Sequence, residues 1–212
     1  TEYYCTVFAF AESPRARGVL WAGSDDGLVH ISRDGGLTWN DVTPPGVPAW
    51  TMISMIEVSP HDAATAYLAA TRYKLDDPRP MLFKTNDYGK TWTDISLGIR
   101  DGDYTRVIRE DPARRGLLYA GTETGVYVST DDGSSWQPLQ ANLPSVPVYD
   151  LTVRDGDLVA ATHGRSFWVL DGLTQIQQIT DDLAEKSFHL LQPGATHRLR
   201  SPGNPRKPSP GK

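Results

Sequence analysis

The carboxylates of Asp103, Glu123 and Asp150 are the candidate catalytic groups of this sequence. Glycoside hydrolysis needs two carboxylates across the scissile bond, and one of them must be protonated at the working pH. Asp25 and Asp26 belong to the same wider set of acidic residues. The sequence places no two of these groups opposite each other, so the catalytic residues stay unknown at this point.

Aromatic and basic side chains recur near these carboxylates and indicate a binding surface. Aromatic faces combined with carboxylates suit a sugar or a peptide, and a His-Gly-Arg string suits an anionic group. The candidate binding residues are Tyr4, Asp25, Trp50, Tyr73, Arg79, Tyr104, Glu123, Tyr149, His163 and Arg165. A structural interpretation stays open, in which the aromatic residues pack between repeats, Arg165 pairs with a neighbouring carboxylate and His163 caps a turn.

Three copies of one eight-residue pattern define the hairpins of the fold that carries these residues. The pattern Ser/Thr-x-Asp-x-Gly-x-Ser/Thr-Trp occupies residues 32–39, 85–92 and 129–136. Its Asp can accept backbone N–H bonds in a tight turn, its Gly supplies a positive φ, and its Trp can cover the hairpin base and fix it to the sheet. The residues with these structural roles are Asp34, Gly36, Trp39, Asp87, Gly89, Trp92, Asp131, Gly133 and Trp136.

This pattern resembles the Asp-box, or bacterial neuraminidase repeat, of sialidases, xyloglucanases and sortilin-like propellers. The resemblance covers roughly residues 3 to 180, and strings such as Leu118–Gly125 and Ala161–Trp168 look like those of bacterial sortilin-like proteins labelled as glycosyl hydrolases. It implies that the three Asp residues are structural elements away from any active site. It also favours a secreted or periplasmic protein.

The spacing of the pattern, 53 residues from Asp34 to Asp87 and 44 from Asp87 to Asp131, predicts propeller blades of four antiparallel strands. We expect an all-β fold with blades at about residues 3–46, 50–98, 103–142 and 148–180. The fourth repeat is degenerate, and Gln175–Ile179 is its expected last strand. Residues 181–200 are expected to form a C-terminal extension that packs on the propeller, and residues 201–212 a Pro/Gly-rich tail or linker.

Four blades are fewer than the six or seven that are common in Asp-box propellers. An open arc would expose blade faces and strand edges to solvent. We therefore expect the chain to be part of a larger propeller of six to eight blades, completed by blades of the same product or of another chain. A ring closed by the four blades alone is the alternative.

In a propeller, the first strand of each blade lines the central channel, and the loops around it surround one mouth. The resemblance places the binding candidates at this mouth. It favours a non-catalytic binding module that presents the mouth to a peptide, a glycan or a partner protein. The alternatives are a sialidase- or xyloglucanase-like glycoside hydrolase and a structural subunit or assembly factor. Arg79, Arg106 and Arg165 follow no sialidase motif, which counts against that activity.

The composition narrows the class of partner and cofactor. The 212 residues carry a net charge of −5, which suggests neither a nucleic-acid nor an anionic-membrane partner. There is no apolar run of the length that a membrane span needs. Cys5, the single cysteine, is expected to be an inert core thiol. No metal-ligand motif, phosphate loop or nucleophile elbow is present, so we expect no metal and no cofactor.

Overall fold

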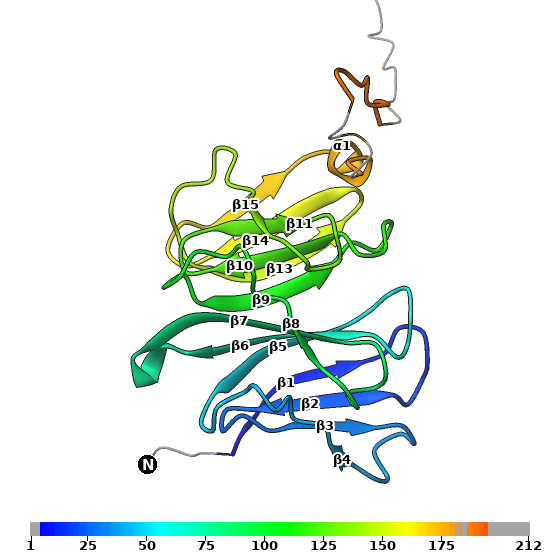
Figure 1. Ribbon diagram of the computed structural model, residues 1–212, viewed down its shortest axis with the longest axis vertical. Coiled ribbons are helices and arrows are strands. Elements are labelled where there is room, and N and C mark those ends of the chain that lie inside the picture. The colour runs from blue at the N-terminus through cyan, green and yellow to red at the C-terminus, as the bar shows by residue number, and fades with distance from the viewer. Residues whose placement is uncertain (1–4, 181–182, 184–185, 195–212) are drawn as a thin grey trace, which may run out of the picture.

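The structure is a computed structural model that describes residues 5–180, 183 and 186–194, and four antiparallel sheets follow one another along the chain (Figure 1). Blade 1 contains β1 (Val7–Glu12), β2 (Leu20–Ser24), β3 (Val29–Ser32) and β4 (Asn40–Asp41). Blade 2 contains β5 (Met52–Val58), β6 (Ala66–Arg72), β7 (Asp77–Thr85) and β8 (Thr93–Asp94), with the 3₁₀ turn η1 (Tyr73–Leu75) between β6 and β7. Blade 3 contains β9 (Thr105–Glu110), β10 (Leu118–Thr122), β11 (Val126–Ser129) and β12 (Gln137–Pro138). Blade 4 contains β13 (Val148–Arg154), β14 (Asp157–Thr162) and β15 (Phe167–Leu170), and the short helix α1 (Thr174–Gln177) follows it.

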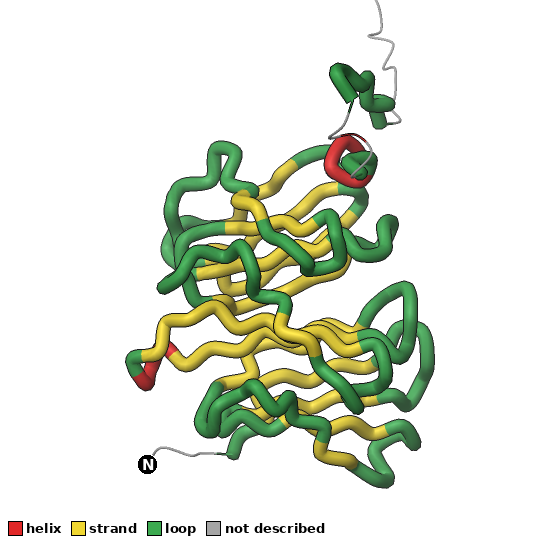
Figure 2. The backbone as a smooth tube through the Cα atoms, viewed as in Figure 1, coloured by secondary structure: helices red, strands yellow, loops and turns green. Residues whose placement is uncertain are grey.

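Each sheet pairs its strands in chain order, which is the arrangement of a β-propeller blade. The described chain is strand and loop almost throughout, with η1 and α1 as the helical exceptions (Figure 2). The prediction of an all-β propeller fold is therefore confirmed.

The hydrophobic core lies between consecutive blades. The first cluster joins blades 1 and 2 through residues such as Trp21 and Leu68. The second joins blades 2 and 3, and the third joins blades 3 and 4 around Tyr119 and Leu151. A blade is thus stabilised by its neighbours, because each sheet is thin and buries apolar area only by stacking.

The eight-residue patterns form tight turns between the third and fourth strands, and we call them box turns (residues 32–39, 85–92 and 129–136). The Asp131 carboxylate accepts hydrogen bonds from the Ser129 hydroxyl (2.7 Å), the Ser135 amide (2.9 Å) and the Ser135 hydroxyl (2.6 Å). The same bonds hold Asp34 and Asp87. The pattern glycine has a positive φ in each turn, 86° at Gly133 for example, as the sequence predicts.

Two of the three box-turn tryptophans join neighbouring blades. Trp92 Nε1 donates to the Val42 carbonyl (2.7 Å), and Trp136 Nε1 donates to the Ile95 carbonyl (2.6 Å). Both acceptors belong to the preceding blade and directly follow its fourth strand. Trp39 has no preceding blade among the described residues; it donates to Gly36 in its own turn and is 40% exposed.

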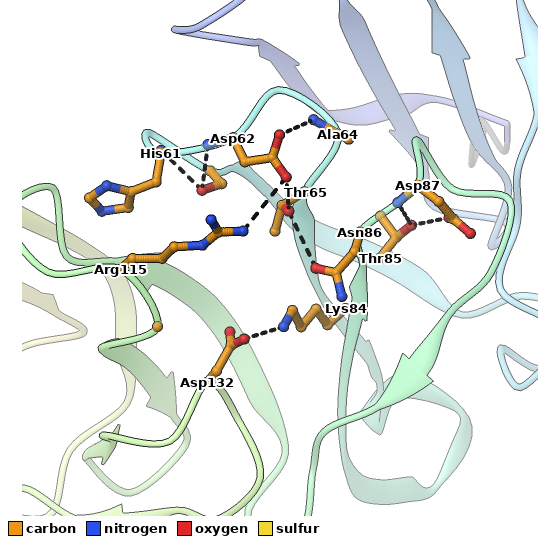
Figure 3. Close-up of polar contacts among 12 residues, drawn as sticks. His61, Asp62, Ala64, Thr65, Lys84, Thr85, Asn86, Asp87, Arg115 and Asp132 are labelled. Carbon is orange, nitrogen blue, oxygen red and sulfur yellow. Dashed lines mark hydrogen bonds and ion pairs between the residues drawn. The ribbon is translucent and has the colours of Figure 1, made fainter. Parts of the chain in front are cut away.

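Polar contacts reinforce the junction between blades 2 and 3 at the box-turn end (Figure 3). Lys84 of β7 forms an ion pair with Asp132 in the third box turn, and the Tyr67 hydroxyl donates to the same carboxylate. Asp62, between β5 and β6, lies 3.7 Å from the Arg115 guanidinium. This end of the junction is therefore held by charge as well as by the tryptophan.

Two expectations are wrong. Residues Gln175–Ile179 do not form a strand, because α1 covers Thr174–Gln177, so blade 4 has three strands in the described part of the chain. Cys5 is exposed rather than buried, and a hydrogen bond with Asp26 raises the pKa of its thiol. Tyr4, the tail at 201–212 and most of the expected extension at 181–200 lie outside the described residues.

Candidate functional site

One end of the blades gathers the segments that the sequence assigns to the channel mouth. The backbone N–H at the start of each 2–3 loop donates to the residue just before the first strand of the same blade. The pairs are Asp25 to Thr6 (3.1 Å), Glu123 to Tyr104 (3.2 Å) and His163 to Pro147 (2.9 Å). In blade 2 the corresponding connection is the longer segment with η1, which projects from the left edge of Figure 1.

The first strand of every blade contains a β-bulge at this end. One residue of the strand is left unpaired there, and the bulge changes the direction of its side chain. The register of the first and second strands shifts by one residue in all four blades. The extra residue is Phe8 in blade 1, Ser54 in blade 2, Arg106 in blade 3 and Tyr149 in blade 4. Bulges re-aim side chains and occur next to functional sites. Here one backbone device presents four different side chains.

Arg106 is the centre of an aromatic cluster built by three blades. Its guanidinium carbon lies 4.2 Å from the ring centroid of Tyr149, 4.9 Å from that of Tyr104 and 5.3 Å from that of Tyr73. The rings of Tyr73 and Tyr104 stack at 4.7 Å, and those of Tyr149 and His163 lie 5.1 Å apart. We call Tyr73, Tyr104, Arg106, Glu123, Tyr149 and His163 the mouth cluster.

Glu123 supplies the counter-charge of the mouth cluster. Arg106 donates to Glu123 from Nε (3.1 Å) and Nη2 (2.6 Å), and Nη2 also donates to the Tyr104 hydroxyl (2.9 Å). Burial and the hydrogen bond with Glu123 raise the pKa of Tyr104 to about 12. The phenol therefore stays protonated at neutral pH, and the cluster offers aromatic faces around a neutralised ion pair.

A second charged group lies on the same first strands. Arg109 donates to Glu57 of blade 2 (2.8 Å), to Asp150 of blade 4 (2.9 Å) and to the Leu151 carbonyl (2.7 Å). Burial raises the pKa of Glu57, against the opposing effect of Arg109. Arg109 thus connects three blades across the region that the first strands line.

The three candidate catalytic carboxylates are not grouped as a pair, and each is engaged by other groups. Glu123 binds Arg106, and Asp150 binds Arg109. Asp103 is fully buried and accepts hydrogen bonds from the Thr124 amide (3.1 Å) and hydroxyl (2.6 Å) and from the Tyr127 hydroxyl (3.1 Å). The Asp103 contacts hold the 2–3 loop of blade 3, which carries Glu123.

Of the binding candidates, Tyr73, Tyr104, Glu123, Tyr149 and His163 come together in the mouth cluster. The other described candidates lie outside it. Asp25 accepts the Thr6 amide (2.9 Å), and the Trp50 amide donates to Asp26 at the blade 1–2 junction (2.9 Å). Arg79 is exposed and binds Asp77, and the Arg165 carbonyl accepts the Trp168 indole N–H (2.9 Å).

Sequence reasoning missed the central role of Arg106 and did not identify Arg109 or Glu57. The available signal was charged residues inside a predicted first strand, a single one in Met52–Val58 and three in Thr105–Glu110. In the described residues no group of three or more His, Cys, Asp or Glu side chains is arranged to hold a metal ion. The described helices also include none that is long and apolar enough to span a membrane.

No protein-family model and no curated protein matches the chain. Solved β-propeller structures match the chain. A YCF48 structure with a bound D1 peptide is 19% identical with a TM-score of 0.59, over 78% of this chain and 52% of that one. A GH74 xyloglucanase from Xanthomonas campestris is 18% identical with a TM-score of 0.60, over 77% of this chain and 29% of that one. The designed protein Ika4 is 11% identical with a TM-score of 0.53, over 80% of this chain and 92% of that one.

These likenesses show the fold. The chain spans about half the length of the YCF48 chains that it matches and under a third of the GH74 chains.

Proposed function

We propose that the chain is a non-catalytic propeller module that binds an extended peptide or a protein segment at the mouth cluster. The observation that carries this proposal is the set of three tyrosine rings around Arg106, contributed by the segments of blades 2, 3 and 4. Tyrosine and arginine are the side chains that most often dominate the energy of protein interfaces. The peptide bound to the YCF48 neighbour is consistent with this class of ligand.

The exposure of the cluster supports binding from solvent. Tyr149 is 49% exposed, and His163 is exposed beside it. Arg106 is held by Glu123 and Tyr104, so its position is fixed before a ligand arrives. Such preorganisation lowers the entropy cost of binding.

A glycoside hydrolase is the rival function, since GH74 enzymes share the fold. Hydrolysis needs one carboxylic acid and one free carboxylate on opposite sides of a glycosidic bond. The ion pairs of Glu123 and Asp150, and the burial of Asp103, favour binding over this chemistry.

The test is selection of seven-residue peptides from a random displayed library, followed by titration of synthetic peptides. Tyr149→Ala and Arg106→Gln should each weaken the selected peptides by about tenfold or more, because such residues act as hot spots. Arg79→Gln is the matched control, since Arg79 lies in β7, is exposed and forms its ion pair with Asp77, outside the mouth cluster. Equal binding by all three variants would contradict the proposal, and so would release of oligosaccharides from xyloglucan.

The two outer faces of the arc support the further proposal that additional blades complete a propeller ring. Phe10 of β1 is 61% exposed, whereas its register equivalents Ile56 and Ile108 are buried between blades. Phe167 of β15 is 74% exposed, whereas the equivalent Val126 is buried. Both faces have the apolar chemistry of an internal blade junction. Sedimentation should therefore give a mass above that of one chain, and Phe10→Glu should reduce it; a monomer at micromolar concentration contradicts this proposal.

A further inference from the structure

The outer edge of β15 is an unpaired strand edge within the described chain. The Thr162 N–H donates to the Ser166 carbonyl (3.1 Å), which fixes the alternation of the antiparallel ladder. The backbone groups of Trp168 and Leu170 consequently face β14, and those of Phe167 and Val169 face the open edge.

In the other three blades this edge is occupied by the fourth strand, and always by the same bond. The Val42 N–H donates to Val29 (2.8 Å), the Ile95 N–H to Leu82 (2.9 Å) and the Leu139 N–H to Val126 (2.8 Å). Each donor is a branched aliphatic residue three positions after a box-turn tryptophan. Phe167 takes the register position of the acceptor in blade 4, and its carbonyl has no hydrogen bond in the described part of the chain.

A small apolar pocket adjoins this edge at the junction of blades 3 and 4. Leu139, Leu143, Leu158, Trp168 and Leu170 contribute to its wall. At the two preceding junctions the equivalent aliphatic residue is covered by the box turn of the next blade. A Cβ added to Gly89 would lie 2.7 Å from Val42 Cβ, and one added to Gly133 would lie 2.8 Å from Ile95 Cδ1.

Leu139 is the third aliphatic residue of this series, and blade 4 has no box turn to cover it. The tryptophans that bond to the Val42 and Ile95 carbonyls therefore have no counterpart at Leu139 among the described residues. The pocket thus lies beside the aliphatic residue at which, in the other two junctions, a box-turn tryptophan donates its hydrogen bond.

We propose that this edge and pocket bind an extended segment of another polypeptide as the fourth strand of blade 4. The segment carries a tryptophan, which enters the pocket over Leu139, and a branched aliphatic residue three positions later, whose N–H donates to Phe167. Strand addition of this kind takes affinity from main-chain hydrogen bonds and specificity from side-chain pockets. Three occupied edges and two occupied tryptophan positions in the same chain define the ligand chemistry, and the site is distinct from the mouth cluster.

The probe is the peptide Gly-Lys-Thr-Trp-Thr-Asp-Ile-Ser, which repeats residues 89–96. Its affinity for the full chain is measured by fluorescence anisotropy, beside a peptide with Ala in place of the Trp. The Ala peptide should bind about tenfold more weakly or worse, since it lacks the buried aromatic anchor.

The chain offers a matched pair of variants at Val169. Val169→Pro removes one N–H that faces the open edge and leaves the bonds to β14, because proline is tolerated on an edge strand with its nitrogen toward solvent. Val169→Thr keeps the N–H and the β-branched shape. We expect Val169→Pro to weaken the probe by about tenfold and Val169→Thr to leave it within about twofold, at similar melting temperatures. Tyr149→Ala, at the mouth, should leave this affinity unchanged.

Three outcomes would overturn the proposal. The first is no binding of the probe at millimolar concentration. The second is equal binding to the Val169→Pro and Val169→Thr variants, which would place the probe elsewhere. The third is a dimer that excludes the probe and dissociates in the Val169→Pro variant, since a second copy of this chain would then hold the edge.

Discussion

Both ends of the blades repeat one backbone feature, but the side chains on that feature are conserved between blades at one end and differ at the other. At the box-turn end, three turns repeat one set of hydrogen bonds around Asp34, Asp87 and Asp131. At the mouth end, a bulge recurs in every blade, but the residue on it changes each time, as in Ser54, Arg106 and Tyr149. Repetition marks the end that has the same structural role in each blade, and divergence marks the end for which we propose ligand binding.

The two ends differ in whether their polar contacts lie within one blade or between several blades. The box-turn carboxylates accept their hydrogen bonds inside their own turn, and Trp92 and Trp136 donate to the preceding blade. The mouth cluster is satisfied across three blades, and its aromatic faces remain partly exposed. Changes at the first end should therefore reduce stability, and changes at the second should reduce binding.

The largest expected effect is at the buried box-turn tryptophan. Trp136→Ala should lower the free energy of unfolding by about 3–5 kcal/mol, because it empties a buried site and removes the bond to Ile95. Trp39→Ala is the matched control at the same pattern position, where the indole is partly exposed and bonds within its own turn. Urea unfolding of both variants measures the difference. Equal losses would show that the tryptophan acts within its hairpin and not between blades.

A smaller loss is expected from the box-turn carboxylate. Asp131→Ala removes three hydrogen bonds and should cost about 1–3 kcal/mol, since each such bond contributes about 0.5–1.5 kcal/mol and the loss is not fully additive. Asp155→Asn is the control, because Asn tolerates the positive φ of 53° at this position, and the ion pair with Arg154 that it removes is almost wholly exposed and should contribute little. Thermal unfolding at pH 7 gives both values. A loss at Asp155 as large as that at Asp131 would contradict the structural role of the turn.

The sequence predicts the box-turn end well because its constraints are local. The Asp, the Gly and the hydroxyl residues of one turn bond to each other within eight positions, as at 129–136. The spacing of these turns then sets the blade boundaries, and the propeller fold follows. The family label drawn from the same pattern stays a resemblance, since a turn motif carries no chemistry of its own.

The mouth is less predictable because it depends on contacts between distant segments. Tyr73, Tyr104 and Tyr149 were candidates as isolated aromatic residues, but only the packed blades place them around Arg106. The bulge that re-aims Arg106 leaves no local sequence signal. The fourth strand of blade 4 is a similar case. Gln175–Ile179 is predicted as a strand from its composition, but Thr174–Gln177 forms α1, where Ile176 packs with Leu173 in the third core cluster.

Acid should reduce the free energy of unfolding, because it protonates the box-turn carboxylates. Hydrogen bonds from the Thr38 hydroxyl and amide lower the pKa of Asp34 to about 2, and those from Thr91 lower the pKa of Asp87. Because the folded pKa lies below the unfolded value of about 3.9, the stabilisation is complete above pH 4 and is lost as the pH falls toward 2.

The measurement for this prediction is urea unfolding at pH 7, 4 and 2.5. Asp34→Asn removes the titrating group and should show a shallower decline below pH 4 than the unmodified chain. Asp155→Asn, at an exposed position, should follow the unmodified chain. Parallel curves for all three proteins would mean that the turn carboxylates do not set the acid limit.

The smallest stability effect is expected at the mouth. Tyr149→Ala should lower the free energy of unfolding by about 1 kcal/mol or less, because the ring is half exposed and its main contacts are to Arg106 and His163. Tyr119→Ala, a fully buried tyrosine that bonds to Asp111, should cost about 3–5 kcal/mol by comparison. If the two variants lose equal stability in urea, the mouth cluster is part of the blade-packing core, and the division between a structural end and a recognition end fails.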